Sequence, residues 1–134
     1  MSRDLILVVE DNEANQMLAR AVLELDGFEV RVAGDAIEAR DQLREATPSL
    51  ILMDLQLPGQ DGLSFTRELR DDPATASIPI VALTAHAMTG DKGTAIRAGC
   101  NGYIAKPIDT RTLGPQVRMF INRRAGEDRE LVAH

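Results

Sequence analysis

Short apolar segments recur along the chain and alternate with longer stretches in which apolar residues have helical spacing. Three of the segments are almost continuously apolar, which is typical of strands buried on both faces of a sheet. The alternation predicts an α/β doubly wound fold, with five parallel strands, right-handed crossovers and five helices on both faces of the sheet. The predicted strands are residues 5–9, 30–33, 50–53, 80–83 and 103–105.

Stripes of apolar residues identify the faces of the predicted helices that should pack on the sheet. The stripes are Met17, Leu18, Ala21, Val22 and Leu25, then Ala36, Ala39, Leu43 and Ala46, and finally Leu113, Val117, Phe120 and Ile121. Gly27 and Pro48 mark the ends of the first two helices, and Asp61 is the expected N-cap of the third.

The last two helices contain residues that disfavour a regular helix. Gly90, Gly93 and Gly99 fall around the fourth, and each costs about 1 kcal/mol relative to alanine inside a helix. We therefore expect a loosely held element, whose looseness could serve switching. Asp109 or Thr110 is the expected cap of the fifth helix, in which Gly114 and Pro115 predict a late start or a kink.

Composition narrows the class of protein. The 134 residues fit one compact domain, and 21 acidic against 15 basic residues give a net charge of −6. This balance disfavours nucleic acid and anionic membranes as partners. Cys100 is the single cysteine, so no internal disulfide forms, and no apolar stretch is long enough to cross a bilayer. A cytoplasmic protein without a membrane or nucleic-acid partner is expected.

Polar residues stand where the predicted strands end: Glu10, Asp11, Asp54, Thr84 and Lys106. The carboxyl ends of parallel strands meet at one edge of the sheet, where ligands of such folds gather. Three carboxylates within about 5 Å would repel one another by a few kcal/mol per pair. Oxygen ligands without nearby Cys or His pairs favour Mg²⁺ as the compensating ion. The lysine and the threonine hydroxyl suit a phosphoryl group.

Four motifs in order resemble the receiver domain of two-component response regulators. They are Val9-Glu10-Asp11-Asn12, Leu52-Met53-Asp54-Leu55 with Pro58 and Gly62 beyond, Ala82-Leu83-Thr84-Ala85, and Tyr103-Ile104-Ala105-Lys106-Pro107. The resemblance covers residues 5–121. The stretch Leu83-Thr84-Ala85-His86-Ala87-Met88, followed by Gly90-Asp91, is most similar to stand-alone receivers of the DivK type and to receivers of hybrid histidine kinases.

The resemblance implies a flavodoxin-like (CheY-like) fold with strand order 2-1-3-4-5. It also implies a receiver domain, expected at residues 1–124. Residues 125–134 mix charges of both signs and lack an apolar stripe, so a frayed tail is expected there, and no output domain is expected. The Lys106-Pro107 peptide bond could be cis, as in the family.

The resemblance also assigns the chemistry. Asp54 is implied to be the phosphoacceptor for a phosphohistidine donor. Asp11, Asp54 and the backbone carbonyl of Gln56 are implied to bind Mg²⁺, with Glu10 acting mainly through a metal-bound water. Lys106 and Thr84 would contact the phosphoryl oxygens, and Thr84 with Tyr103 would form the switch. Such a protein is no enzyme in the usual sense, although it catalyses its own phosphorylation and dephosphorylation.

The implied partners are a sensor or hybrid histidine kinase, a histidine phosphotransfer protein, or both. A monomer or a weak, phosphorylation-dependent dimer is expected. The output would be contact with other proteins, as a diffusible regulator, a relay intermediate or a phosphate sink.

Simpler explanations exist for each residue taken alone. Glu10 and Asp11 could be helix caps or solvated turn residues, Thr84 a plain strand residue and Lys106 a surface lysine. Tyr103 could be a half-buried aromatic with its hydroxyl in solvent. His86 and Gln56 could either border the site or be solvated loop residues, and Cys100 is most simply a small residue at a helix end.

Other classes of protein fit less well. A haloacid dehalogenase-type phosphatase places a second acid two residues after its aspartate, where this chain has Gln56. A flavodoxin-like redox protein would need aromatics to sandwich a flavin, and a nucleotide hydrolase would need a Gly-rich loop ending in Lys-Ser or Lys-Thr. The alternative left open is a docking adaptor with a receiver fold that works without phosphorylation.

Overall fold

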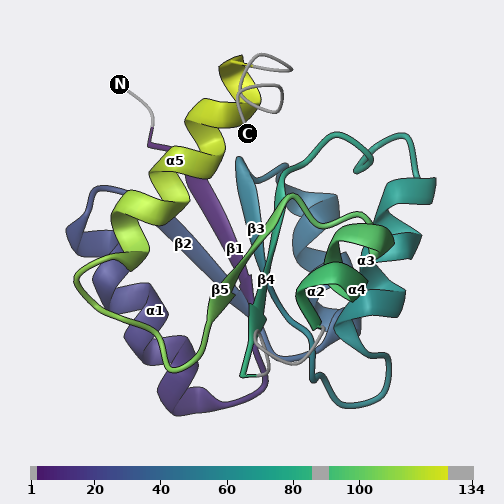
Figure 1. The fold of residues 1–134 in the computed structure, drawn as a ribbon, viewed down its shortest axis with the longest axis horizontal. Helices are drawn as coiled ribbons and strands as arrows, with labels where there is room; N and C mark the ends of the chain where they lie inside the picture. Colours follow the sequence, from purple (N-terminus) through teal and green to yellow (C-terminus); the bar gives the residue numbers. More distant parts are fainter. Residues whose placement is uncertain (1–2, 86–90, 127–134) are drawn as a thin grey trace.

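The computed structural model describes residues 3–85 and 91–126 and shows a parallel sheet between two layers of helices (Figure 1). The strands are β1 (Leu5–Val9), β2 (Glu29–Ala33), β3 (Leu50–Asp54), β4 (Ile80–Thr84) and β5 (Gly102–Ala105). They pair in the order β2-β1-β3-β4-β5, and every pair is parallel. The predicted fold class and strand order are confirmed.

Helices cover both faces of the sheet. On one face lie α1 (Glu13–Leu25) and α5 (Leu113–Gly126), and on the other lie α2 (Ala36–Glu45), α3 (Gly62–Asp71) and α4 (Asp91–Ala98) (Figure 1). The core is correspondingly split in two. Leu50 and Leu52 point into the half under α1 and α5, whereas Ile51 and Met53 point into the other half. This burial on both faces explains the continuous apolar run of β3.

Local signals set the helix boundaries, and of these Asp61 and Gly27 were expected. The side chains of Asn12, Asp35 and Asp61 cap α1, α2 and α3 by accepting a hydrogen bond from a backbone N–H three residues later. Gly27 ends α1 with a φ of 95°, a conformation that glycine adopts without steric cost.

The fifth helix begins late, as Pro115 predicts. The helix starts at Leu113, and the N–H of Gln116 donates to the carbonyl of Thr112. Pro115 therefore lies in the first turn, where backbone N–H groups have no intrahelical partner. Asp109, one of the two expected caps, lies four residues before the start of α5. It makes cap-like bonds in the turn that leads into the helix, accepting hydrogen bonds from the N–H groups of Thr112 and Leu113 on its carbonyl and of Arg111 on its side chain.

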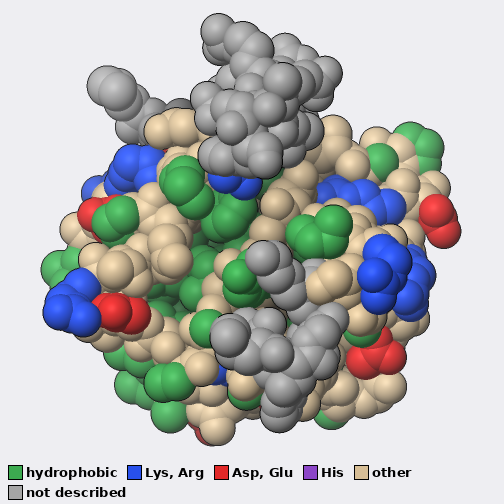
Figure 2. Space-filling model, viewed as in Figure 1, with side chains coloured by type: hydrophobic (Ala, Val, Ile, Leu, Met, Phe, Trp, Pro, Cys, Tyr) green, Lys and Arg blue, Asp and Glu red, His purple; other side chains and the backbone are tan. Residues whose placement is uncertain are grey.

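The predicted inner face of α1 was wrong except at Val22, which is partly buried and packs against the core. Ala19 and Leu23 are fully buried, whereas Met17 is 70% and Leu25 is 90% exposed. Figure 2 shows hydrophobic side chains reaching the surface over the region where α1 lies. The helix carries two apolar stripes, and spacing alone does not tell which one faces the sheet. The side-chain amide of Gln16, which donates to the carbonyl of Glu10, lies on the buried side.

Two further predictions concern residues at the limits of the described chain. α5 ends at Gly126, and the rest of the predicted tail, residues 127–134, lies outside the described residues, as does His86.

Within residues 3–85 and 91–126, no helix is long and apolar enough to cross a membrane.

Candidate functional site

Three carboxylates meet at the carboxyl ends of β1 and β3. The parallel register aligns Val9 with Met53, so the residues that follow them, Glu10 and Asp54, come side by side. Glu10 is 1% and Asp54 is 2% exposed, whereas Asp11 is exposed. Each of the three offers a carboxylate oxygen, and these oxygens lie within 4.8 Å of one another. The predicted acidic cluster therefore forms in three dimensions.

Lys106 joins the cluster from the end of β5. Its Nζ lies 3.0 Å from Oε1 of Glu10 and 3.1 Å from Oδ2 of Asp54. Its backbone N–H donates to the carbonyl of Thr84 at 2.8 Å, and its peptide bond to Pro107 is cis. One ammonium group thus compensates two buried carboxylates.

Burial and charge pairing shift the proton affinities of this group. Loss of hydration raises the pKa of Glu10, although its contacts with Lys106 and the N–H of Asn12 oppose the shift. Burial would lower the pKa of Lys106, but the hydrogen bonds and charges of Glu10 and Asp54 outweigh it and raise that pKa. The lysine is therefore charged at neutral pH, and the cluster still carries excess negative charge.

Backbone contacts hold the two buried carboxylates in place. The N–H of Gln56 donates to Oδ1 of Asp54 at 3.0 Å, and the N–H of Asn12 donates to Oε2 of Glu10 at 3.1 Å. Gly62 packs so closely over the backbone of Asp54 that a Cβ would overlap its carbonyl oxygen. Gln16, which anchors the carbonyl of Glu10, was missed by sequence reasoning because a glutamine inside a helix carries no distinguishing signal.

Thr84 and Tyr103 lie on neighbouring strands on the same face of the sheet. Thr84 ends β4, is 3% exposed and pairs with Ala105. Tyr103 is two residues before Ala105 and packs, partly buried, against the core half under α2, α3 and α4. The two residues of the predicted switch therefore lie on the same face, with Tyr103 paired to Ala82, two residues before Thr84.

The donor set fits a hard divalent cation. The carboxylates supply only oxygen ligands, which Mg²⁺ prefers, and one of the three is exposed so that bound waters can remain. Oε1 of Glu10 is buried without a hydrogen-bond partner among the described residues, apart from its ion pair with Lys106. A cation beside this cluster would offset the remaining negative charge.

Three carboxylates, a threonine and a lysine meet at the carboxyl edge of a doubly wound sheet with this strand order. This fold and this site together define a receiver-type protein. Comparison with protein families agrees, because the model of the response regulator receiver domain matches residues 6–118. The chain belongs to this family.

Individual relatives extend the comparison. The polar-differentiation response regulator DivK of Brucella anthropi is 46% identical over 116 residues, which cover 87% of this chain and 94% of that protein. The receiver domain of a sensor histidine kinase from Pseudomonas aeruginosa, solved with magnesium coordinated in its active-site cleft, is 38% identical with a TM-score of 0.83, covering 91% of this chain and all of that one. A CheY-like receiver protein from Methanospirillum hungatei is 25% identical with a TM-score of 0.84, covering 94% and 99% of the two chains.

Proposed function

We propose that this protein is a signalling receiver that accepts a phosphoryl group on Asp54 from a phosphohistidine of a partner protein. The observation that carries the proposal is the placement of Asp54, buried at the end of β3 with Lys106 Nζ at 3.1 Å and two further carboxylates beside it. A purely structural aspartate gains nothing from such crowding. A phosphoacceptor needs both the positive charge of Lys106 and the two neighbouring carboxylates.

The transfer is an in-line displacement. A carboxylate oxygen of Asp54 attacks phosphorus, the P–N bond of the phosphohistidine breaks, and the electron pair leaves with the imidazole nitrogen, which gives an acyl phosphate. Lys106, already within reach of Oδ2, then pairs with a phosphoryl oxygen. A groove of about 290 Å³ lined by Asn15, Ala85, Lys106, Pro107 and Ile108 opens beside the lysine.

Glu10, Asp11, Asp54 and the backbone carbonyl of Gln56 would hold Mg²⁺, with Glu10 acting mainly through a bound water. When bound, the ion neutralises charge on the phosphoryl oxygens. The same residues support hydrolysis of the acyl phosphate, which returns Asp54 to its free form.

The output follows from Thr84 and Tyr103. We propose that the Thr84 hydroxyl donates to a phosphoryl oxygen and that Tyr103 moves into the space this leaves, which repacks the surface of α4, β5 and α5. The placement of the two residues on one face of neighbouring strands supports this coupling. The partners would be a sensor or hybrid histidine kinase, a histidine phosphotransfer protein, or both.

Intact mass after incubation with acetyl phosphate or phosphoramidate tests the proposal. Wild type, Asp54→Asn and Asp71→Asn are compared with and without Mg²⁺; Asp71 is an exposed carboxylate at the end of α3 and serves as the matched control. We expect one added phosphoryl group on wild type and Asp71→Asn with Mg²⁺ and none on Asp54→Asn.

Two results would contradict parts of the proposal. Phosphorylation of Asp54→Asn at the wild-type level would refute Asp54 as the acceptor. No mass gain in any folded variant would favour a docking adaptor that works without phosphorylation.

A further inference from the structure

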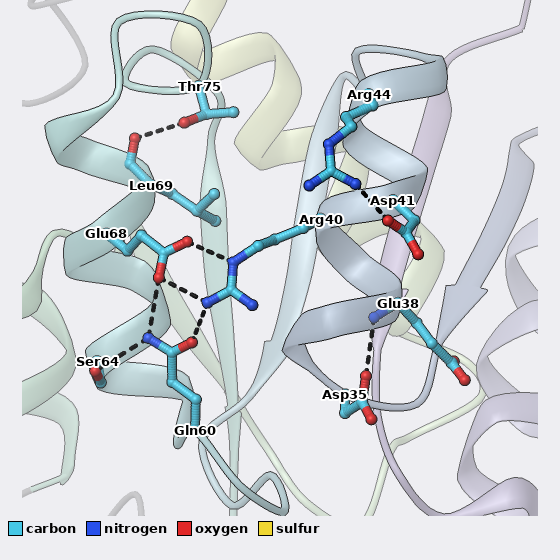
Figure 3. Close-up of polar contacts among 10 residues, drawn as sticks. All are labelled: Asp35, Glu38, Arg40, Asp41, Arg44, Gln60, Ser64, Glu68, Leu69 and Thr75. Carbon is cyan, nitrogen blue, oxygen red and sulfur yellow. Dashed lines mark hydrogen bonds and ion pairs between the residues drawn. The ribbon is translucent and has the colours of Figure 1, made fainter.

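A network of polar side chains joins α2, α3 and the loop between β3 and α3 on the face opposite α1 (Figure 3). Arg40 reaches from α2 to Glu68 on α3, with Nε 2.6 Å from Oε2 and Nη2 2.7 Å from Oε1. The two parallel bonds form a bidentate ion pair, which fixes orientation as well as distance. The same guanidinium lies 5.2 Å from the centre of the buried Phe65 ring.

Gln60 brings the loop into this network. Nη2 of Arg40 donates to Oε1 of Gln60, and Nε2 of Gln60 donates to Ser64 Oγ at 3.2 Å and to Glu68 Oε1 at 3.1 Å. Figure 3 shows the amide nitrogen of Gln60 directed at Ser64 and Glu68 and its oxygen directed at Arg40. Both ends of this amide are therefore used to tie the loop to the two helices.

The loop between β3 and α3 begins directly after Asp54, the proposed phosphoacceptor. It spans residues 55–61 and carries Gln56, whose N–H donates to Asp54. Leu55 and Leu57 are buried and anchor its first half, whereas Pro58 and Gly59 are exposed and Gly59 has a φ of 77°. The Gln60 amide thus holds the second half, where apolar burial does not.

We propose that Arg40 is a positioning residue for the metal site: through Gln60 it holds the 55–61 loop, so that the backbone of Gln56 stays beside the Asp54 carboxylate. The inference rests on the proposed function, because it concerns the residues proposed to hold Mg²⁺. Its physical basis is preorganisation, since a loop already held in place loses less conformational freedom when its carbonyl binds the ion.

Four substitutions separate this role from plain stabilisation. Arg40→Ala removes the bonds of the guanidinium to Glu68 and Gln60 but leaves those of Gln60 to Ser64 and Glu68. Gln60→Ala cuts the loop from an intact Arg40–Glu68 pair. Arg40→Lys keeps a charge for Glu68 but loses the planar fork that serves Glu68 and Gln60 together. Arg31→Ala is the matched control: Arg31 is 34% exposed against 33% for Arg40, and it pairs with Glu45 at 2.9 Å, away from the loop.

Two measurements report on each variant. One is the Kd for Mg²⁺ by titration calorimetry, and the other is amide hydrogen exchange of Gln56, Leu57, Gly59 and Gln60 in protein freed of metal by a chelator. We expect Arg40→Ala and Gln60→Ala each to raise the Kd about three- to tenfold, below the 10- to 100-fold typical of direct outer-shell partners. Exchange in the loop should speed up in both variants, and the Arg40→Ala/Gln60→Ala double variant should be no worse than Gln60→Ala alone. Arg40→Lys should raise the Kd as Gln60→Ala does, and Arg31→Ala should leave it unchanged.

The outcomes distinguish this inference from the proposed function. Unchanged Kd and unchanged loop exchange in Arg40→Ala and Gln60→Ala would overturn the positioning role, while wild type that binds Mg²⁺ keeps the proposed function. An equal rise of Kd in Arg31→Ala would also overturn it, because the effect would then be general destabilisation. If wild type does not bind Mg²⁺, the metal-site proposal fails, and the positioning role fails with it.

Discussion

Glu10 occupies a position where a charged carboxylate is costly, being 1% exposed beside Asp54. Burial raises its pKa above the ordinary 4.5, so the folded protein keeps a proton at pH values where the unfolded chain has released it. Stability of the metal-free protein therefore falls as pH rises from about 4.5 through the raised pKa. The folded protein loses this stability before any ion or phosphoryl group binds.

Glu10→Gln tests that cost. The variant should be more stable than wild type at neutral pH in the presence of a chelator, and the gain should vanish as pH falls below 4.5, where both side chains are neutral. Urea unfolding between pH 4 and 8 measures the difference, with Glu24→Gln on the exposed side of α1 as the control. A pH-independent difference would show that shape, not charge, separates the two proteins.

Gly62 is the second residue at which the site constrains the chain. It begins α3 directly over the backbone of Asp54, where a Cβ would overlap the Asp54 carbonyl oxygen and approach Leu55 Cα. Neither is the end of a flexible side chain, so Gly62→Ala should cost about 1–3 kcal/mol and shift Asp54.

The free energy of unfolding and the rate of phosphorylation check this expectation together. Gly93→Ala, within α4, is the matched control: the nearest atom to its Cβ among the described residues would be Arg97 Nη1, at 3.4 Å, and alanine favours a helix by about 1 kcal/mol. The control should be at least as stable as wild type and phosphorylated normally. A Gly62→Ala protein with the stability and phosphorylation rate of wild type would contradict this expectation, because the backbone around Asp54 would then shift at little cost.

Among the elements, α1 shows that apolar spacing alone does not identify the buried face of a helix. Its buried face holds Ala19 and Leu23, so Leu23→Ala should cost about 2–5 kcal/mol. Leu25→Ala should stay within about 0.5 kcal/mol, because Leu25 is 90% exposed. Equilibrium unfolding in urea measures both. Equal losses in the two variants would contradict the orientation described here.

The strands were predictable and the helix faces only partly so. β3 is buried on both sides, so its continuous apolar run could not be mistaken for another pattern, and only its last residue, Asp54, was placed outside it. In α1 two stripes compete, and the small Ala19 where the helix meets the sheet gives a weak signal. The Arg40–Gln60–Glu68 network was invisible for another reason, since its members are 8 to 28 residues apart and meet only after folding.

At the scale of the whole molecule, the candidate site is a product of topology. Glu10, Asp54, Thr84 and Lys106 come from four different strands, and only a parallel sheet brings the ends of those strands to one edge. The sequence could predict this meeting because each residue ends an apolar run. It could not predict that Lys106 would contact Glu10 and Asp54 at nearly equal distances.

The same topology links metal binding to the stability of the fold. Mg²⁺ bound at the cluster should stabilise the folded protein by about 2.7 kcal/mol at 100 times its Kd, and the melting temperature should rise by several degrees. Asp11→Asn should change the metal-free protein by no more than about 0.5 kcal/mol, because Asp11 is exposed, yet remove most of the gain from Mg²⁺.

Thermal unfolding across a Mg²⁺ titration measures this linkage, with Ca²⁺ for comparison and Asp71→Asn as an exposed carboxylate away from the cluster. The control should retain the full gain. A melting temperature that ignores Mg²⁺ in wild type would contradict the metal site. An equal gain in Asp11→Asn would instead keep a metal site but remove Asp11 from it, leaving Glu10, Asp54 and the Gln56 carbonyl as the ligands.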